Sequence, residues 1–234
     1  MGEDSNGDGM TAPKQGKIAK LLGAAVRFWL TTQVDVVDEL EVTVGGTARE
    51  LLSGCLPGVT VRATGVVYQG LALQNVAIAA SKIKINLSQI LRGKPLQLQE
   101  AIAIDLVQTL TAANLNQSIT APLLEQAIAD FIRPLLATAD PVPFTPKHLS
   151  LGENTLILQG IWHDRPLTLT TGLSLSNSHT LFFGNPKWTW DREAPVDLPA
   201  VENFEIDLGE DVAFRGLAIA PDKIQCEGTL LVRP

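Results

Sequence analysis

The residues of this chain that could take part in catalysis are few and widely spaced. Its histidines all lie in the C-terminal half, at His148, His163 and His179. His163 and Asp164 are adjacent, and such a pair could orient a base for the hydroxyl of Ser174 or Thr170. The pair also falls in an expected turn, where solvated polar residues are the usual occupants. An enzyme built around His163 is therefore the least favoured function.

The sequence offers no recognisable metal or redox site. Cys55 and Cys226 are 171 positions apart and have no CxxC partner, which argues against a zinc site or a disulfide scaffold. The acidic residues between 191 and 211 lack the alternating ligands and central glycine of a calcium loop. No glycine-rich phosphate loop, HExxH or GxSxG motif occurs. We therefore expect no catalytic residue, no metal and no cofactor.

The balance of charge limits the partners. The net charge is −7, from 18 basic and 25 acidic residues, which disfavours binding to nucleic acid. Residues 1–100 carry 10 basic and 9 acidic groups, whereas residues 101–234 carry 8 and 16. Between Thr11 and Leu30 every charged residue is basic, so we expect any basic contact surface to begin there.

No export signal or membrane-spanning segment is apparent. Residues 1–16 are polar and acidic at the start, unlike the basic and then apolar start of a secretory signal. The best apolar stretch, Leu21 to Val34, has 14 residues and falls short of the ~20 that span a bilayer. These features predict a disordered polar tail over 1–16 and a cytoplasmic protein.

Residues 17–40 are expected to form one long amphipathic helix, because their apolar residues recur with a period of about 3.6. Its charged face carries Lys17, Lys20 and Arg27. A wide apolar face containing Phe28 and Trp29, edged by basic residues, is what an interfacial membrane helix needs. A helix that packs against a core and leaves its lysines in water would show the same pattern, so both alternatives stay open.

From Leu40 onward, alternating apolar and polar residues predict antiparallel strands, interrupted by short helices at 48–53 and 88–92. A second long amphipathic helix is expected over 123–136, with a proline-rich crossover at 137–147. The chain has 34 Leu against 12 aromatic residues, so the strands carry aliphatic faces. Such faces form either an ordinary core or a groove for acyl chains, which bind through area rather than directed bonds.

Three groups of residues between 27 and 131 form a distinctive combination. They are Leu51-Leu52-Ser53-Gly54 with Pro57-Gly58, Tyr68-Gln69-Gly70-Leu71, and Ile85-Asn86-Leu87 with Leu91-Arg92-Gly93-Lys94-Pro95. Together they resemble the LmeA-like phospholipid-binding family, and Arg27-Phe28-Trp29-Leu30 is similar to its cyanobacterial branch. The resemblance implies phospholipid binding and an α+β fold. In that fold a long curved antiparallel β-sheet wraps around one or two amphipathic helices, as in tubular lipid-binding proteins.

The leading hypothesis is a non-catalytic phospholipid-binding or lipid-transfer protein, with a single domain over 17–234, that docks peripherally on membranes. It assigns acyl-chain or membrane contact to Ile18, Leu21, Leu22, Val26, Phe28, Trp29, Leu124, Ile128 and Phe131. It assigns phospholipid head groups to Lys17, Lys20, Arg27, Arg92 and Lys94. One alternative is an interaction protein whose apolar faces bury against a protein partner, with no lipid. The other is a lipid-modifying enzyme built around His163.

Overall fold

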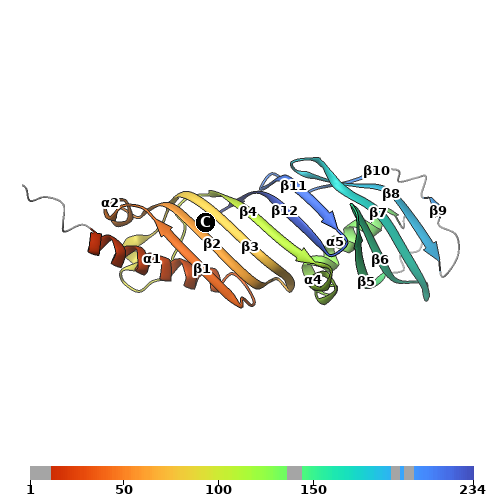
Figure 1. The fold of residues 1–234 in the computed structure, drawn as a ribbon, viewed down its shortest axis with the longest axis horizontal. Helices are drawn as coiled ribbons and strands as arrows, with labels where there is room; N and C mark the ends of the chain where they lie inside the picture. The colour runs from red at the N-terminus through yellow and green to blue at the C-terminus, as the bar shows by residue number, and fades with distance from the viewer. Residues whose placement is uncertain (1–11, 136–143, 191–195, 198–202) are drawn as a thin grey trace, which may run out of the picture.

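The computed structural model describes residues 12–135, 144–190, 196–197 and 203–234 as an elongated molecule with two antiparallel sheets end to end (Figure 1). The described helices are α1 (Ala12–Thr31), α2 (Ala48–Leu52), α3 (Leu87–Ile90), α4 (Ala112–Gln117) and α5 (Pro122–Leu135). The predicted α+β class, with curved antiparallel strands and amphipathic helices, is confirmed. The one predicted sheet is in fact divided into two.

The first sheet has six strands in the order β1-β2-β3-β4-β12-β11. Their bounds are β1 (Glu39–Gly45), β2 (Cys55–Tyr68), β3 (Leu71–Lys84), β4 (Ile102–Thr111), β11 (Val212–Ala220) and β12 (Lys223–Val232). In β2, Val59 and Val61 are buried whereas Thr60 and Arg62 are exposed. This alternation gives the sheet one apolar face, here called the inner face. α1 packs against the inner face.

The second sheet has the order β10-β8-β7-β6-β5, and β9 pairs with β8. Its strands are β5 (Thr145–Gly152), β6 (Thr155–Trp162), β7 (Arg165–Asn177), β8 (Thr180–Trp190), β9 (Val196–Asp197) and β10 (Asn203–Asp207). The chain then returns to the first sheet, because β12 pairs with β4 from Lys223 opposite Thr111 to Val232 opposite Ile102. The chain from β10 onward therefore contributes to both sheets: β10 belongs to the second sheet, and β11 and β12 belong to the first.

The N-terminal helix ends earlier than predicted. α1 stops at Thr31, and Leu40 lies in β1, so the prediction of a helix through residue 40 is wrong. The hydroxyls of Thr31 and Thr32 donate to backbone carbonyls one turn back, at 2.7 and 2.6 Å. Such bonds and the stiff β-branched residues that follow weaken a helix. Val36 instead pairs with Val67 of β2.

The other predicted helices lie close to the observed ones. The short helices expected at 48–53 and 88–92 are α2 and α3, and the second long helix is α5. α1 begins at Ala12, inside the predicted polar tail, while residues 1–11 lie outside the described residues. Most of the predicted crossover at 137–147 also lies outside them, and β5 begins at Thr145.

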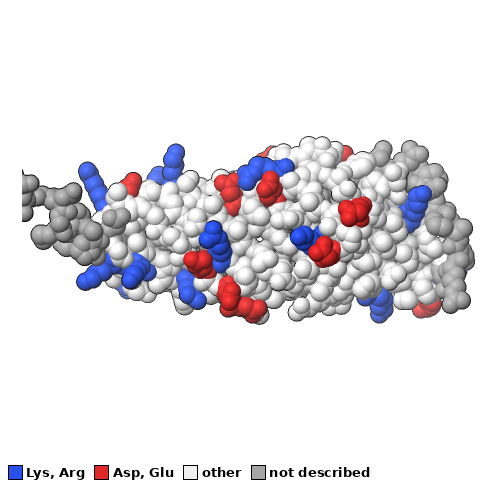
Figure 2. Space-filling model, in the orientation of Figure 1, with Lys and Arg blue, Asp and Glu red and all other residues white. Residues whose placement is uncertain are grey.

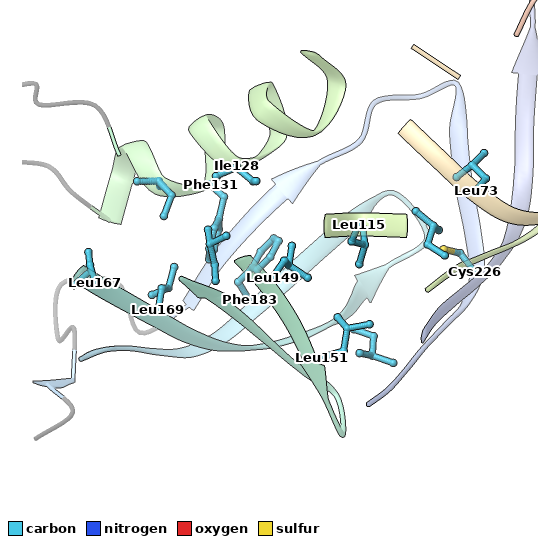
Figure 3. Close-up of a cluster of buried hydrophobic side chains, with 14 of the residues drawn as sticks. Leu73, Leu115, Ile128, Phe131, Leu149, Leu151, Leu167, Leu169, Phe183 and Cys226 are labelled. Atoms are coloured by element: carbon cyan, nitrogen blue, oxygen red, sulfur yellow. The ribbon is translucent and has the colours of Figure 1, made fainter. Parts of the chain in front are cut away.

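Two clusters of buried side chains hold these elements together. The cluster beneath α1 joins Leu22 and Val26 of α1 and Leu51 of α2 to the inner face of the first sheet. The larger cluster joins both sheets to α4 and α5 through residues that include Leu115, Phe131, Leu149, Leu167, Leu169 and Phe183 (Figure 3). The rings of Phe131 and Phe183 have centroids 4.4 Å apart. Each long helix is thus fixed by its own apolar contacts.

An ion pair on the outer face ties β4 to β11 across β12. Arg215 Nη1 donates to Asp105 Oδ1 at 2.7 Å and to Thr229 Oγ1 at 2.9 Å. The hydrogen bond from Arg215 and its positive charge hold the pKa of Asp105 below its ordinary value of 3.8. Only the ionised carboxylate is favoured by this arrangement, so its contribution to stability depends on pH.

The neighbouring residues Leu51 and Leu52 test how α2 is held. Leu51 is fully buried and Leu52 is largely exposed. Leu51→Ala should lower the free energy of unfolding by about 2–5 kcal/mol, because it leaves a cavity beneath α1. Leu52→Ala is the matched control and should change it by less than about 0.5 kcal/mol. Urea unfolding followed by circular dichroism measures both, and equal losses would contradict this packing of α2.

The ion pair predicts a pH-dependent difference between the wild type and Asp105→Asn. The variant should be less stable near neutral pH, by a small amount because both partners are about half exposed. As the pH falls below 3.8 and through the lowered pKa of Asp105, the wild type should lose this advantage. Thermal melts across that range measure the difference, with Asp222→Asn as the control. A difference that persists in acid would show that the charge of Asp105 is not its source.

Candidate functional site

An apolar cavity of about 360 Å³ lies between α1 and the inner face of the first sheet. α1 contributes Val26, Trp29 and Leu30 to its wall. The strands contribute aliphatic side chains, which include Val59, Val61, Ile78, Ala80, Ile102, Ile104 and Val232. Because side chains of a strand alternate between its faces, these residues all point to the inner face. The cavity is therefore a place where apolar matter, rather than a charged substrate, would be sheltered.

Polar groups reach the cavity at few places. Among its described lining residues, apart from the Trp29 indole, only Gln33, Tyr68 and Arg233 carry polar side chains. Arg233 is held in a two-point ion pair, with Nη2 2.7 Å from Asp211 Oδ1 and Nε 3.2 Å from Asp211 Oδ2. Its hydrogen bonds and charge lower the pKa of Asp211. The remaining N–H groups of this guanidinium can also donate to the oxygens of a tetrahedral phosphate group.

α1 presents two different faces. Towards the sheet, Leu22 is fully buried, Val26 is nearly so, and Ile18 and Trp29 are half-buried. On the opposite side Leu21 and Phe28 are exposed. The predicted lipid-contacting residues of this helix therefore divide into four that face inward and two that face solvent. Of the inward four, Val26 and Trp29 line the cavity.

The basic residues of α1 lie on its exposed side. Lys17, Lys20 and Arg27 are all exposed, beside Leu21 and Phe28. Residues 17, 21 and 28 share one side of the helix, because positions four and seven apart are neighbours on a helical surface. The exposed side of α1 thus combines positive charge with two large apolar side chains.

The predicted contact residues of α5 lie away from the cavity. Ile128 and Phe131 are buried in the core between the two sheets, and Leu124 packs against that core. None of the three lines the cavity beneath α1. The ring centroid of Phe131 lies 4.4 Å from that of Phe183 and 5.9 Å from that of Phe204. The structure gives these side chains a packing role.

Arg92 and Lys94 lie in a turn next to one end of the cavity. Both are exposed, and the chain continues from them into Leu96 and Leu98 of the cavity wall. The buried amide of Asn86 fixes this turn: its Nδ2 donates to the Pro95 carbonyl at 3.0 Å, and its Oδ1 accepts from Gln97 N at 2.8 Å. The structure therefore brings two of the predicted head-group residues near the apolar wall.

A second hollow, of about 610 Å³, lies at the β1 edge and the outer face of the first sheet. Its lining mixes the cations Arg27 and Arg62 with the carboxylates Asp38, Glu39 and Glu41. Because charges of both signs and polar strand residues such as Thr64 and Asn75 line it, this hollow is a polar depression of the surface. We take the smaller cavity as the candidate site because its lining is almost uniformly apolar and therefore suits an apolar ligand.

The catalytic alternative finds no support in the geometry. His163 and Asp164 form the turn between β6 and β7, and Ser174 lies nine positions beyond Arg165, which starts β7. At about 3.3 Å per residue this places Ser174 about 30 Å from the turn and Thr170 about 16 Å from it.

No group of three or more possible metal ligands occurs among the described residues. Within the same residues, no helix has both the length and the hydropathy to cross a membrane.

Part of the cavity wall was not predicted from the sequence. Tyr68, Val232 and Arg233 line the cavity, yet none of them was among the predicted contact residues. Tyr68 belongs to the Tyr68-Gln69-Gly70-Leu71 group, whereas Val232 and Arg233 belong to no motif. The alternation in β2, β3 and β4 signals which residues face inward, yet the part of that face left open depends on where α1 crosses the sheet. Arg233 joins the wall only because β12 pairs with β4.

Comparison with known proteins agrees with this geometry. The family model described as LmeA-like phospholipid-binding matches residues 15–229. No curated protein and no solved structure matches the chain. The match extends beyond the resemblance seen in residues 27–131 and reaches β11 and most of β12, the strands that return to the first sheet. Since the match covers most of the 234 residues, the chain belongs to the LmeA-like phospholipid-binding family.

Proposed function

We propose that this protein is a non-catalytic phospholipid-binding or lipid-transfer protein that shelters acyl chains in the cavity beneath α1. The observation that carries the proposal is the cavity itself, about 360 Å³ with an almost wholly aliphatic wall. Small-molecule sites in proteins have volumes of about 300–1,000 Å³. Each methylene moved from water into such a site contributes about 0.8 kcal/mol, so a chain is retained without directed bonds.

The polar groups around the cavity suit a phospholipid better than a free hydrocarbon. Arg92 and Lys94 stand beside one end of the wall, and Arg233 stands at another part of it. A phosphate near any of these cations would form charge-assisted bonds while its acyl chain lies among Val59, Val61 and their neighbours. The arrangement needs no nucleophile and no general base.

The exposed side of α1 supports peripheral docking on membranes. Leu21 and Phe28 would enter the interface, and Lys17, Lys20 and Arg27 would meet anionic head groups. The inward face of the helix, with Leu22 and Val26, would remain packed on the sheet as the cover of the cavity. One helix thus serves as cover and as contact surface.

Filling the cavity should displace the lipid. Ala80 lines the cavity, whereas its neighbour Ala79 is exposed on the outer face of β3. Ala80→Phe places a ring in the space proposed for the acyl chain, so lipid that copurifies with the protein should fall severalfold. Ala79→Phe is the matched control and should keep the lipid content of the wild type. Native extraction of lipid and mass spectrometry measure both, without detergent at any step.

Two results would count against the proposal. An absence of any enriched lipid in folded wild-type protein would favour a protein that buries its apolar faces against a partner. Equal lipid content in Ala80→Phe and Ala79→Phe would place the bound lipid outside the cavity.

Charge reversal on α1 tests the docking. Each Lys near an anionic surface contributes about 1 kcal/mol, so Lys17→Glu with Lys20→Glu should weaken binding to anionic vesicles by tenfold or more. The control is Lys147→Glu with Lys223→Glu, which makes the same change of net charge on exposed residues of β5 and β12. Sedimentation with vesicles measures the affinity. Equal weakening in the two variants would assign the effect to net charge rather than to α1.

A further inference from the structure

One end of the molecule combines exposed leucines with a local excess of positive charge. α2, the segment 87–95 that contains α3, and the first exposed turns of α1 lie together at that end (Figure 1). Leu52, the last residue of α2, is 58% exposed, and Leu91, which follows α3, is 59% exposed. Large apolar side chains with this exposure, on segments that are adjacent in the fold, are typical of a contact surface.

Both leucines are presented by well-anchored segments. The backbone N–H of Ile85 donates to the Gly54 carbonyl at 2.9 Å, which joins the chain after α2 to the chain before α3. α2 is held by the fully buried Leu51 and by the mutual capping bonds of Thr47 and Glu50. The turn after α3 is held by the buried Asn86. The exposure of the leucines is therefore built into the fold.

The charge of this end is opposite to that of the whole chain. Residues 16–24, 45–58 and 81–100 carry seven Lys and Arg and two Asp and Glu, in a chain of net charge −7. Glu50 accepts hydrogen bonds from Thr47, and Glu100 forms an ion pair with Lys84 at 2.9 Å. Figure 2 shows Lys and Arg predominating where α1 begins. A negatively charged surface is the complementary partner.

The same end adjoins the cavity. Ile85 precedes the segment 87–95, Leu96 and Leu98 follow it, and all three line the cavity. A bilayer in contact with Leu91 would therefore lie next to one end of the apolar wall. An acyl chain could pass between bilayer and cavity with little exposure to water, which is the costly part of moving a lipid.

We infer that this end, defined by Leu52, Leu91, Arg49, Arg92 and Lys94 and named the docking end, binds the surface of an anionic phospholipid bilayer. The leucines enter the interface and the basic side chains contact lipid phosphates. Neither leucine lines the cavity beneath α1, and both are largely exposed, so both are accessible to a bilayer. The inference rests on the proposed function and adds the elements besides α1 that meet the membrane.

The test uses the full chain and vesicles of phosphatidylglycerol mixed with phosphatidylcholine. Leu52→Ser with Leu91→Ser should weaken sedimentation with these vesicles by about tenfold or more, because two apolar side chains no longer enter the interface. The control is Val107→Ser with Leu123→Ser, which alters residues of β4 and α5 that are 40% and 39% exposed. The control should bind as the wild type does, and vesicles of phosphatidylcholine alone should bind all forms weakly.

If the Leu52→Ser, Leu91→Ser variant has a wild-type melting curve and binds the mixed vesicles as the wild type does, the inference that the docking end binds the bilayer is wrong. Equally strong binding of the wild type to neutral and mixed vesicles would overturn the electrostatic basis of the docking end. No binding of the wild type to either kind of vesicle would favour a protein partner. Lipid that copurifies with each variant is measured in parallel. The docking variant should keep the lipid content of the wild type, so loss of vesicle binding with lipid retained separates a failure of docking from a failure of the cavity.

Discussion

The apolar contact between α1 and the inner face of the first sheet is the constraint on which the rest of the structure depends. Apolar surface left in water costs about 25 cal/mol per Å², so the inner face must be covered. α1 covers it through Leu22 and Val26, but a helix is only about 10–12 Å wide. Six strands spaced at about 4.8 Å extend over about 24 Å. One helix therefore cannot cover the whole face; part of the remainder packs into the larger cluster, and part is the wall of the cavity.

The second half of the molecule meets the same requirement with different side chains. There α5 lies against the second sheet, and the rings of Phe131, Phe183 and Phe204 fill the space between them at centroid distances of 4.4 to 6.0 Å. Beneath α1 the lining is mostly Val, Ile and Leu. Aromatic rings bring more volume per residue than branched aliphatic chains do. The placement of the few aromatic residues thus helps to decide which half is packed and which half keeps a cavity.

The local parts of this fold could be predicted from the sequence, and the long-range parts could not. Alternation revealed the strands, and the helical period revealed α5 and most of α1. The helical period failed beyond Thr31, where Val36, which continued it, pairs with Val67 of β2 instead. The pairing of β12 with β4 joins segments more than 100 residues apart, so no local pattern reveals that Arg233 lies at the cavity. Leu124, Ile128 and Phe131 share a helical face whether that face meets lipid or core, and their core position depends on the second sheet.

The pattern of α1 was ambiguous for a physical reason. Membrane interfaces and protein cores both select apolar residues by area, so a helix that meets either has the same period. In this protein the wide apolar face packs on the sheet, while the narrower line from Leu21 to Phe28 stays exposed among basic residues. In the proposed function, recognition by area would also account for the absence of a chemical motif, because an acyl chain offers no directed bond to match. The unfilled apolar space and the cations beside it, on which that proposal rests, are properties of the assembled sheet and helix rather than of any short segment.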